Sequence, residues 1–388
     1  MQNLTEPSGS HFSIETVHRY NEYLASLCGF FATSLLLYLI RFKNSKELKS
    51  YSPMLQLACF FDFVLLVAGV MSVTQIEITP SATFVFMGSF LEHTSLTIHA
   101  ILLFLHLCAS SNISFVQIQF YYRYVLICRK DTLSGQKICL LASFALFLSC
   151  IDASVTVWCF TKTTDSQSMF ESFLKGIYWR QPSGQLRAFL VADTQSFEFI
   201  FLALYAFIVV GMGYTLLIWF FYKINKELKK SAQLMTAKTK LLHRQLNAVL
   251  LIQSIAPFVV SIIPISFIFI NAILHIEIVP GMGLLTTMTL AWIPVVNCTA
   301  TIMLIGPFRK FVLSKWVIVF GRCYSPEKRT RLRMSFSVTA VGPQYKPSRS
   351  NSDNEEHHRP EERKGSIWVL MNKVNLNRLS LPVIGATA

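Results

Sequence analysis

The stretch QIQFYYRYVLICRK, residues Gln117–Lys130, places one arginine at the end of a long apolar run. This arginine, Arg123, stands between Tyr122 and Tyr124, and no Lys or Arg precedes it as far back as Leu96. A helix needs about 20 apolar residues to cross the hydrocarbon core of a bilayer. The run before Arg123 is long enough, so the arginine marks the point where a membrane-spanning helix ends.

The composition also indicates a membrane protein. Of the 388 residues, 53% are hydrophobic and only 14% are charged, whereas a soluble domain carries about 25% charged residues. The nine cysteines are scattered, form no CxxC pair and lie mostly in apolar runs, where they act as small buried hydrophobes. No His/Cys spacing suggests zinc, and we expect neither a metal site nor a nucleic-acid partner.

Seven apolar runs are candidate membrane-spanning helices. They are Leu24–Ile40, Pro53–Val73, Leu96–Tyr122, Ile138–Phe160, Phe199–Tyr222, Leu246–Leu274 and Met282–Ile305. All 35 Lys and Arg residues fall outside them, as expected because a charge in lipid is costly. The sequence therefore predicts an all-α membrane protein with a seven-transmembrane helix bundle over residues 24–305.

The basic residues predict the orientation of the bundle. The loops after the first, third and fifth spans carry four, four and seven Lys or Arg. The loops after the second and sixth carry none, and the long loop after the fourth carries four. By the positive-inside rule, residues 1–23 are extracellular and the C-terminus is cytoplasmic. We expect no cleavable signal peptide before Leu24. Asn3, within the sequon Asn-Leu-Thr, is a candidate glycosylation site.

The segment after the seventh span changes character. Residues 306–321 mix aromatic and basic residues and predict a short amphipathic helix on the lipids of the inner leaflet. Cys323 follows and is a candidate for palmitoylation; a free cytosolic thiol is the alternative. Residues 322–388 predict a cytoplasmic tail that is mostly disordered, with Ser335 and Ser352 as candidate phosphorylation sites.

Three motifs in order resemble those of one receptor family. FYYRYVL (Phe120–Leu126) resembles an F-x-Y-R-Y signature that ends the third helix. QLNAVLLIQSIAP (Gln245–Pro257) resembles the family's sixth-helix pattern, and IPVVNCTATIMLIGPFR (Ile293–Arg309) its seventh-helix ending. The chain thus resembles the nematode serpentine chemoreceptors, most closely class D, a branch of the seven-transmembrane G-protein-coupled receptors.

This resemblance implies a chemosensory receptor that binds an external odorant or pheromone and activates a heterotrimeric G protein. It implies a place in the plasma membrane or a sensory cilium and no enzymatic activity; HExxH, GxSxG and P-loop motifs are also absent. The residues expected to contact the G protein are Arg123, Tyr124, Lys226, Lys230 and Arg244. For Arg123 the alternative is an interface anchor that snorkels.

A membrane transporter or channel for a small solute is the alternative function. Many transporters carry internal repeats with broken helices at matching positions, and this chain shows no repeat. The sequence also departs from the broad receptor superfamily. Tyr122 replaces the acid that usually precedes the arginine, no Glu stands at the foot of the sixth span, and Cys159 has no obvious partner for the usual disulfide.

Asp62, Asn112 and Asn297 lie at one depth in their spans, roughly 12–17 Å from the end that carries Arg123 at 1.5 Å per residue. They form a candidate polar centre, and the resemblance implies a possible sodium ion at Asp62. The alternative is that each bonds a neighbouring carbonyl or hydroxyl group.

Two further sets of residues are candidates for function. A ligand pocket is expected from His99, Asp152, Glu198 and Trp292. Helix kinks are expected at Pro257, Pro264 and Pro294, because proline removes a backbone donor and bends a helix. Kinks supply pivots, which suits a receptor whose helix ends move when a ligand binds.

Overall fold

The structure is a computed structural model. It describes residues 14–43, 46–79, 81–110, 112–162, 167–174, 186–233, 235–274 and 281–321, all within one compact unit, Met1–Ala340. Asn3, Cys323, Ser335 and Ser352 lie outside the described residues, as does the predicted tail.

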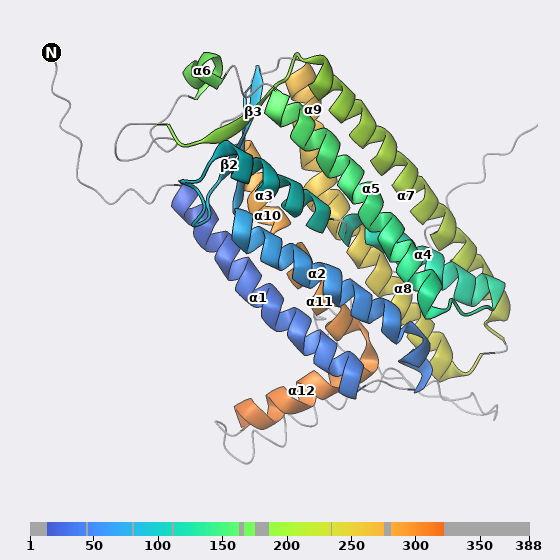
Figure 1. Ribbon diagram of the computed structural model, residues 1–388. Coiled ribbons are helices and arrows are strands. Elements are labelled where there is room, and N and C mark those ends of the chain that lie inside the picture. The colour runs from blue at the N-terminus through green and yellow to red at the C-terminus, as the bar shows by residue number, and fades with distance from the viewer. Residues whose placement is uncertain are drawn as a thin grey trace, which may run out of the picture. The chain divides into compact units, whose positions relative to one another are not determined.

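Seven helices in the described residues are long and apolar enough to cross a membrane. They are Ile14–Phe42, Leu48–Ser72, Leu96–Arg129, Gly135–Lys162, Phe197–Ser231, Ala237–Asn271 and Met282–Leu304. They pack side by side into a bundle (Figure 1). The predicted seven-helix fold is therefore confirmed.

Several helices extend beyond the predicted spans. The first, α1 (Ile14–Phe42), begins ten residues before Leu24, and α7 (Phe197–Ser231) continues past Tyr222. The predicted ends were set by apolarity, but a helix satisfies its own backbone hydrogen bonds and can continue among polar residues. α2 (Ser52–Ser72) follows the short η1 (Lys46–Tyr51), and α5 (Gly135–Lys162) forms the fourth span.

Three spans are interrupted. The third is divided into α3 (Leu96–Ala109) and α4 (Asn112–Tyr124), followed by the π-helical turn η2 (Val125–Arg129). The sixth runs through α8 (Ala237–Pro257), the π-helical η6 (Phe258–Ile262) and α9 (Ile263–Ile273). The seventh consists of α10 (Met282–Leu290) and α11 (Ile293–Leu304), and α12 (Gly306–Gly321) follows it.

The three prolines lie at these interruptions. Pro257 is the last residue of α8, directly before the π-helical turn, and Pro264 is the second residue of α9. Pro294 occupies the first turn of α11, where a missing backbone donor does no harm. The sixth and seventh spans thus change helical geometry beside the residues at which kinks were predicted.

A three-stranded antiparallel sheet was not predicted. Its strands β1 (Thr74–Ile78), β2 (Ala82–Met87) and β3 (Phe189–Asp193) pair in the order β1-β2-β3, and Val85 faces both Ile76 and Leu190. The sheet joins the connection between the second and third spans to the segment before the fifth. We call the end of the bundle with these strands the sheet end, and the opposite end, with Arg123, the arginine end.

Two glycines permit close packing on the first and seventh spans. A Cβ atom at Gly29 of α1 would lie 2.5 Å from the Cδ2 atom of Leu66, so α1 and α2 approach closely there. A Cβ atom at Gly283 would lie 2.5 Å from the main-chain oxygen of Ile76, which places α10 directly against β1. The sheet is thereby fixed to the bundle as a cover over its end.

Candidate functional site

Arg123 is buried at the arginine end, with 1% of its surface exposed. Its Nη2 atom donates a hydrogen bond of 2.6 Å to the main-chain oxygen of His243 on α8. Its guanidinium carbon lies 5.7 Å from the centroid of the Tyr51 ring, a cation–π geometry. A snorkelling arginine would direct its charge to water, whereas this one is turned into the bundle.

A small cavity of about 30 Å³ adjoins Arg123, enough for one or two water molecules. Its lining comes from η1, α2, α4 and α8, and it consists of Tyr51, Met54, Leu55, Gln119, Tyr122, Arg123, Leu246, Val249 and Leu250. The Nε and Nη1 atoms of Arg123 are buried and make no hydrogen bond with a described residue. The arginine is therefore held only by neutral protein groups, as expected from the absence of the usual acids.

Tyr122, in the place of the usual acid, has a different role. Its hydroxyl donates a hydrogen bond of 2.5 Å to the main-chain oxygen of Ser50, and its ring packs edge-on against Tyr51. Tyr51 also packs edge-on against His243. The aromatic rings thus join the start of the second span to the third and sixth spans around Arg123.

The other predicted G-protein contacts form an exposed rim around this buried group. Lys226 and Lys230 lie exposed on α7, and Arg244 is exposed on α8. Tyr124 is half-buried and packs on Trp219 and Phe220 of α7, with ring centroids 5.5 and 5.4 Å away. The arginine end therefore presents a basic surface beside a buried cation.

Asp62 and Asn297 meet in the middle of the bundle. The Nδ2 atom of Asn297 donates to the Oδ1 atom of Asp62 at 3.3 Å, and the thiol of Cys298 points to Oδ2 at 3.6 Å. Thr33 contacts the same thiol at 3.3 Å. Asn112 starts α4, but its side chain lies outside the described residues. The centre thus joins α1, α2 and α11.

This centre fits sodium in part. Hard cations take oxygen ligands, and the Oδ1 atom of Asn297 is buried without a hydrogen-bond partner. Asp62 would supply a carboxylate, whereas the thiol of Cys298 is a poor ligand for a hard ion. Among the described residues no group of three or more His, Cys, Asp or Glu side chains could hold a metal ion.

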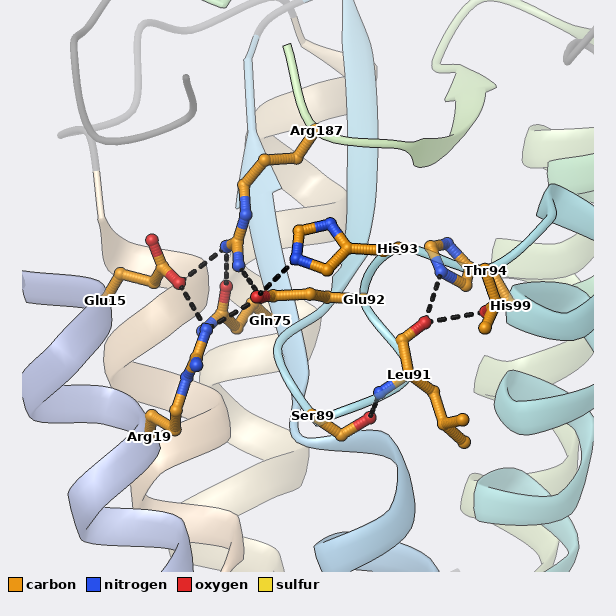
Figure 2. A network of polar contacts seen from close by, with 10 residues as sticks. All are labelled: Glu15, Arg19, Gln75, Ser89, Leu91, Glu92, His93, Thr94, His99 and Arg187. Atoms are coloured by element: carbon orange, nitrogen blue, oxygen red, sulfur yellow. Dashed lines mark hydrogen bonds and ion pairs between the residues drawn. The ribbon is translucent and has the colours of Figure 1, made fainter. Parts of the chain in front are cut away.

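At the sheet end, a network of charged side chains joins three separate segments (Figure 2). Arg187, just before β3, pairs with Glu15 of α1 at 2.6 Å and with Glu92 in the loop between β2 and α3. Arg19 bridges the same two carboxylates at 3.1 and 2.7 Å. His93 also contacts Glu92 at 3.3 Å. Two arginines thus alternate with two glutamates.

The network holds the segment before β3, which in the broad receptor superfamily is joined to the third span by a disulfide. All eight described cysteines, Cys159 included, are free thiols. Glu92 lies just before α3, and Arg187 lies just before β3, so their ion pair joins the third span to the connection that leads into the fifth. Only 9% of the Arg187 side chain is exposed, and screening by solvent is correspondingly weak.

The four residues predicted to line a ligand pocket lie in different surroundings. His99 contacts the main-chain oxygen of Leu91 at 3.3 Å, and Glu198 pairs with Lys162 at the sheet end of α5. Trp292 donates from Nε1 to Asn21 at 3.1 Å. Asp152 is half-buried on α5. The contacts of these residues do not join them into one site.

Sequence reasoning missed three buried ionisable residues near the sheet end. His18 and Glu22 stand one turn apart on α1, 0% and 5% exposed, and His18 contacts Thr287 at 2.9 Å. Glu77 of β1 is 5% exposed. The spacing of His18, Glu22 and Ser26 is typical of one face of a helix, and the alternation within Thr74–Ile78 is typical of a strand, but both signals lie outside the apolar runs that predict the spans.

Glu77 predicts a dependence of stability on pH. Its Oε1 atom accepts a hydrogen bond from the backbone of Gly281 at 3.2 Å. Burial raises the pKa of Glu77 from 4.5 to about 7, although the Gly281 bond opposes this. The folded chain therefore holds this proton more tightly than the unfolded chain does. The free energy of unfolding should fall as pH rises from 4.5 to 7, by about 1.4 kcal/mol per unit at most.

Thermal unfolding in detergent at pH 5 and pH 8, compared between the native chain and Glu77→Gln, measures this effect. Gln keeps the hydrogen-bond acceptor and cannot ionise, so the variant should show a smaller difference between the two pH values. An equal difference in both proteins would contradict the prediction.

With this geometry established, two comparisons give matches. The family model described as "Serpentine type 7TM GPCR chemoreceptor Str" matches residues 18–313. The crystal structure of squid rhodopsin aligns with a TM-score of 0.51 and 14% sequence identity, covering 82% of this chain and 91% of that chain. At this identity the likeness concerns the fold alone. No curated protein matches the sequence.

Proposed function

Because the chain belongs to the Str family of serpentine seven-transmembrane chemoreceptors, we propose that this multi-pass membrane protein binds an external small molecule and activates a heterotrimeric G protein. The sheet end faces outward and the arginine end faces the cytosol. We expect the protein to lie in the plasma membrane or in a sensory cilium. A closer kinship with class D and a nematode source stay predictions, since the matching family model is that of Str.

The buried Arg123 is the observation that carries the proposal. Burying a cation against a carbonyl oxygen and an aromatic ring carries a desolvation cost, and a role in coupling accounts for its place there. If α8 moved away from α4, the bond to His243 would break, and Arg123 would reach the basic rim of Lys226 and Arg244.

The mechanism follows from a shift between two helix arrangements. A ligand that binds one arrangement more tightly raises the population of that arrangement. The π-helical turn after Pro257 and the break between α10 and α11 lie between the two ends of the bundle. These interruptions supply the pivots through which binding at the sheet end would separate α8 from α4 at the arginine end.

The proposal is tested in cells that express the full chain with a cAMP, cGMP or calcium reporter and are exposed to a panel of volatile and lipophilic small molecules. We expect at least one compound to evoke a signal that disappears when the G protein is inactivated. Solute flux that persists without any G protein would favour a transporter instead.

We further propose that Asp62 and Asn297 hold a sodium ion. Bound sodium would neutralise the buried carboxylate and favour the folded receptor by mass action. At a sodium concentration ten times the Kd, the gain in unfolding free energy is about 1.4 kcal/mol. Replacing choline chloride with sodium chloride at constant ionic strength should therefore raise the Tm of the purified receptor.

Asp62→Asn should remove this sodium effect, while Glu22→Gln, a matched change at another buried carboxyl group, should leave it intact. The measurement needs no ligand and no G protein. A sodium-dependent Tm that persists in Asp62→Asn would exclude the site.

A further inference from the structure

A single acidic side chain lies about halfway along the fourth span. Between Lys137 and Lys162, α5 carries one charged residue, Asp152. Ten residues separate Asp152 from Lys162, which is about 15 Å along a helix, half the thickness of the hydrocarbon core. Placing a carboxylate at this depth of a bilayer costs free energy, and such residues generally mark a functional site.

The carboxylate of Asp152 has no bonding partner in the described part of the chain. Thr156 bonds the main-chain oxygen of Asp152, at 2.9 Å, and not its carboxylate. Tyr205 of α7 and Cys108 of α3 lie within electrostatic range, but neither donates a hydrogen bond to it. Asp152 is half-buried, so part of this residue can be reached by a molecule that arrives between the helices.

α5 and α7 lie side by side (Figure 1). We call the line between them the α5–α7 seam, marked by Asp152, Lys162, Glu198 and Tyr205. The ion pair of Lys162 with Glu198 closes the seam at the sheet end. That pair uses the only lysine or arginine of α5 near this end, so no cation of α5 is left for Asp152.

An aromatic ladder on α7 leads along the seam toward Asp152. Phe197 stacks on Phe201 with centroids 6.2 Å apart, and Phe201 stacks on Tyr205 at 6.4 Å. Phe197 and Phe201 are 72% and 43% exposed. Aromatic faces attract ammonium groups, and Leu204 and Ile208 beside the ladder expose apolar surface to lipid.

We propose that the α5–α7 seam is a binding site for lipophilic amines that partition into the bilayer. The ammonium group pairs with Asp152 and lies against the ring of Tyr205, and the alkyl chain runs along the exposed apolar face of α7. A neutral amphiphile of the same length lacks the charge and binds weakly. The proposal concerns binding alone, so it stands apart from coupling to a G protein.

The test uses the full chain in nanodiscs of zwitterionic phosphatidylcholine and a photoreactive dodecylamine that carries a diazirine on its chain. The matched diazirine-bearing dodecanol is the neutral control probe. Mass spectrometry of the crosslinked peptides should place the amine label on the stretch from Phe201 to Ile208. Labelling by the amine should exceed labelling by the alcohol about tenfold, as expected for one charge-assisted contact.

Asp152→Asn should reduce amine labelling about tenfold to the level of the alcohol, whereas Asp152→Glu should retain most of it. Glu198→Gln makes the same chemical change at another carboxylate of the seam and should not reduce labelling. Equal labelling by amine and alcohol in the native chain would overturn the proposal, and this comparison needs no variant. An amine signal that survives in a folded Asp152→Asn, or that falls equally in Glu198→Gln, would also overturn it.

Discussion

Replacement of Arg123 by alanine is expected to reduce ligand-evoked nucleotide exchange on the G protein by about 30-fold or more, the effect of losing one buried anchor at an interface. The alanine variant lacks the only cation that is buried within the described part of this end. Its loss removes one hydrogen bond to His243 and the contact with the Tyr51 ring and leaves a cavity, so exchange is compared between receptors shown to be folded. Arg123→Lys should restore little of the nucleotide exchange, since a lysine cannot reproduce the planar, multi-donor geometry of the guanidinium group.

The measurement is nucleotide exchange with purified receptor, heterotrimer and an agonist found in the cellular screen. Arg244→Ala is the matched control, since this arginine is exposed on the rim. Its replacement should lower the rate of nucleotide exchange only a few-fold. Agonist binding by Arg123→Ala should be retained, so that a loss of exchange reports coupling. Full exchange by a folded Arg123→Ala receptor would contradict the proposed role.

Reversal of the charge at position 187 should have the largest effect on stability. Arg187→Glu would place a third carboxylate beside Glu15 and Glu92, and breaking a buried ion pair costs about 3–5 kcal/mol. We expect a clearly lower Tm and easier proteolysis of the segment before β3. The double variant Arg187→Glu, Glu92→Arg should recover part of the loss, because it restores one attractive pair.

Thermal unfolding of the two variants and the native chain in nanodiscs tests this prediction. Arg187→Met keeps a side chain of similar length, and it removes the attraction without adding repulsion. Its Tm should therefore fall between those of the native chain and Arg187→Glu. Lys162→Glu, at an exposed ion pair on α5, should change the Tm by little. A similar Tm for Arg187→Glu and the native chain would mean that the network does not hold the sheet end.

The seven spans were predictable because lipid imposes a simple rule on composition. Apolar runs without Lys or Arg identified each helix, and the uneven distribution of basic residues predicted the orientation. The helix ends were less accessible, since α7 continues to Ser231 and α8 starts at Ala237 among charged residues. Thr236 caps α8 by accepting from the backbone of Thr239, a local signal that a search for apolar runs does not weigh.

The sheet and the charge network depend on contacts between distant segments. Gln75–Ile78 alternates polar and apolar residues, a local signal of a strand, but β2 shows no such alternation, and its pairing with β3 joins residues about a hundred positions apart. Glu15, Glu92 and Arg187 come from three segments whose proximity no local pattern reveals. The motif at Phe120–Leu126 located Arg123, yet its burial depends on a main-chain oxygen of α8, which no side-chain pattern specifies.

The neutral surroundings of Arg123 have a consequence for how the cell would use this receptor. One hydrogen bond to a carbonyl oxygen contributes about 0.5–1.5 kcal/mol, somewhat more when the donor is charged, so under the proposed mechanism the bond to His243 would favour the silent form only slightly. In that case a weakly binding ligand would be enough to raise the population of the active form. The proposed mechanism would also give measurable activity of the receptor in the absence of any ligand.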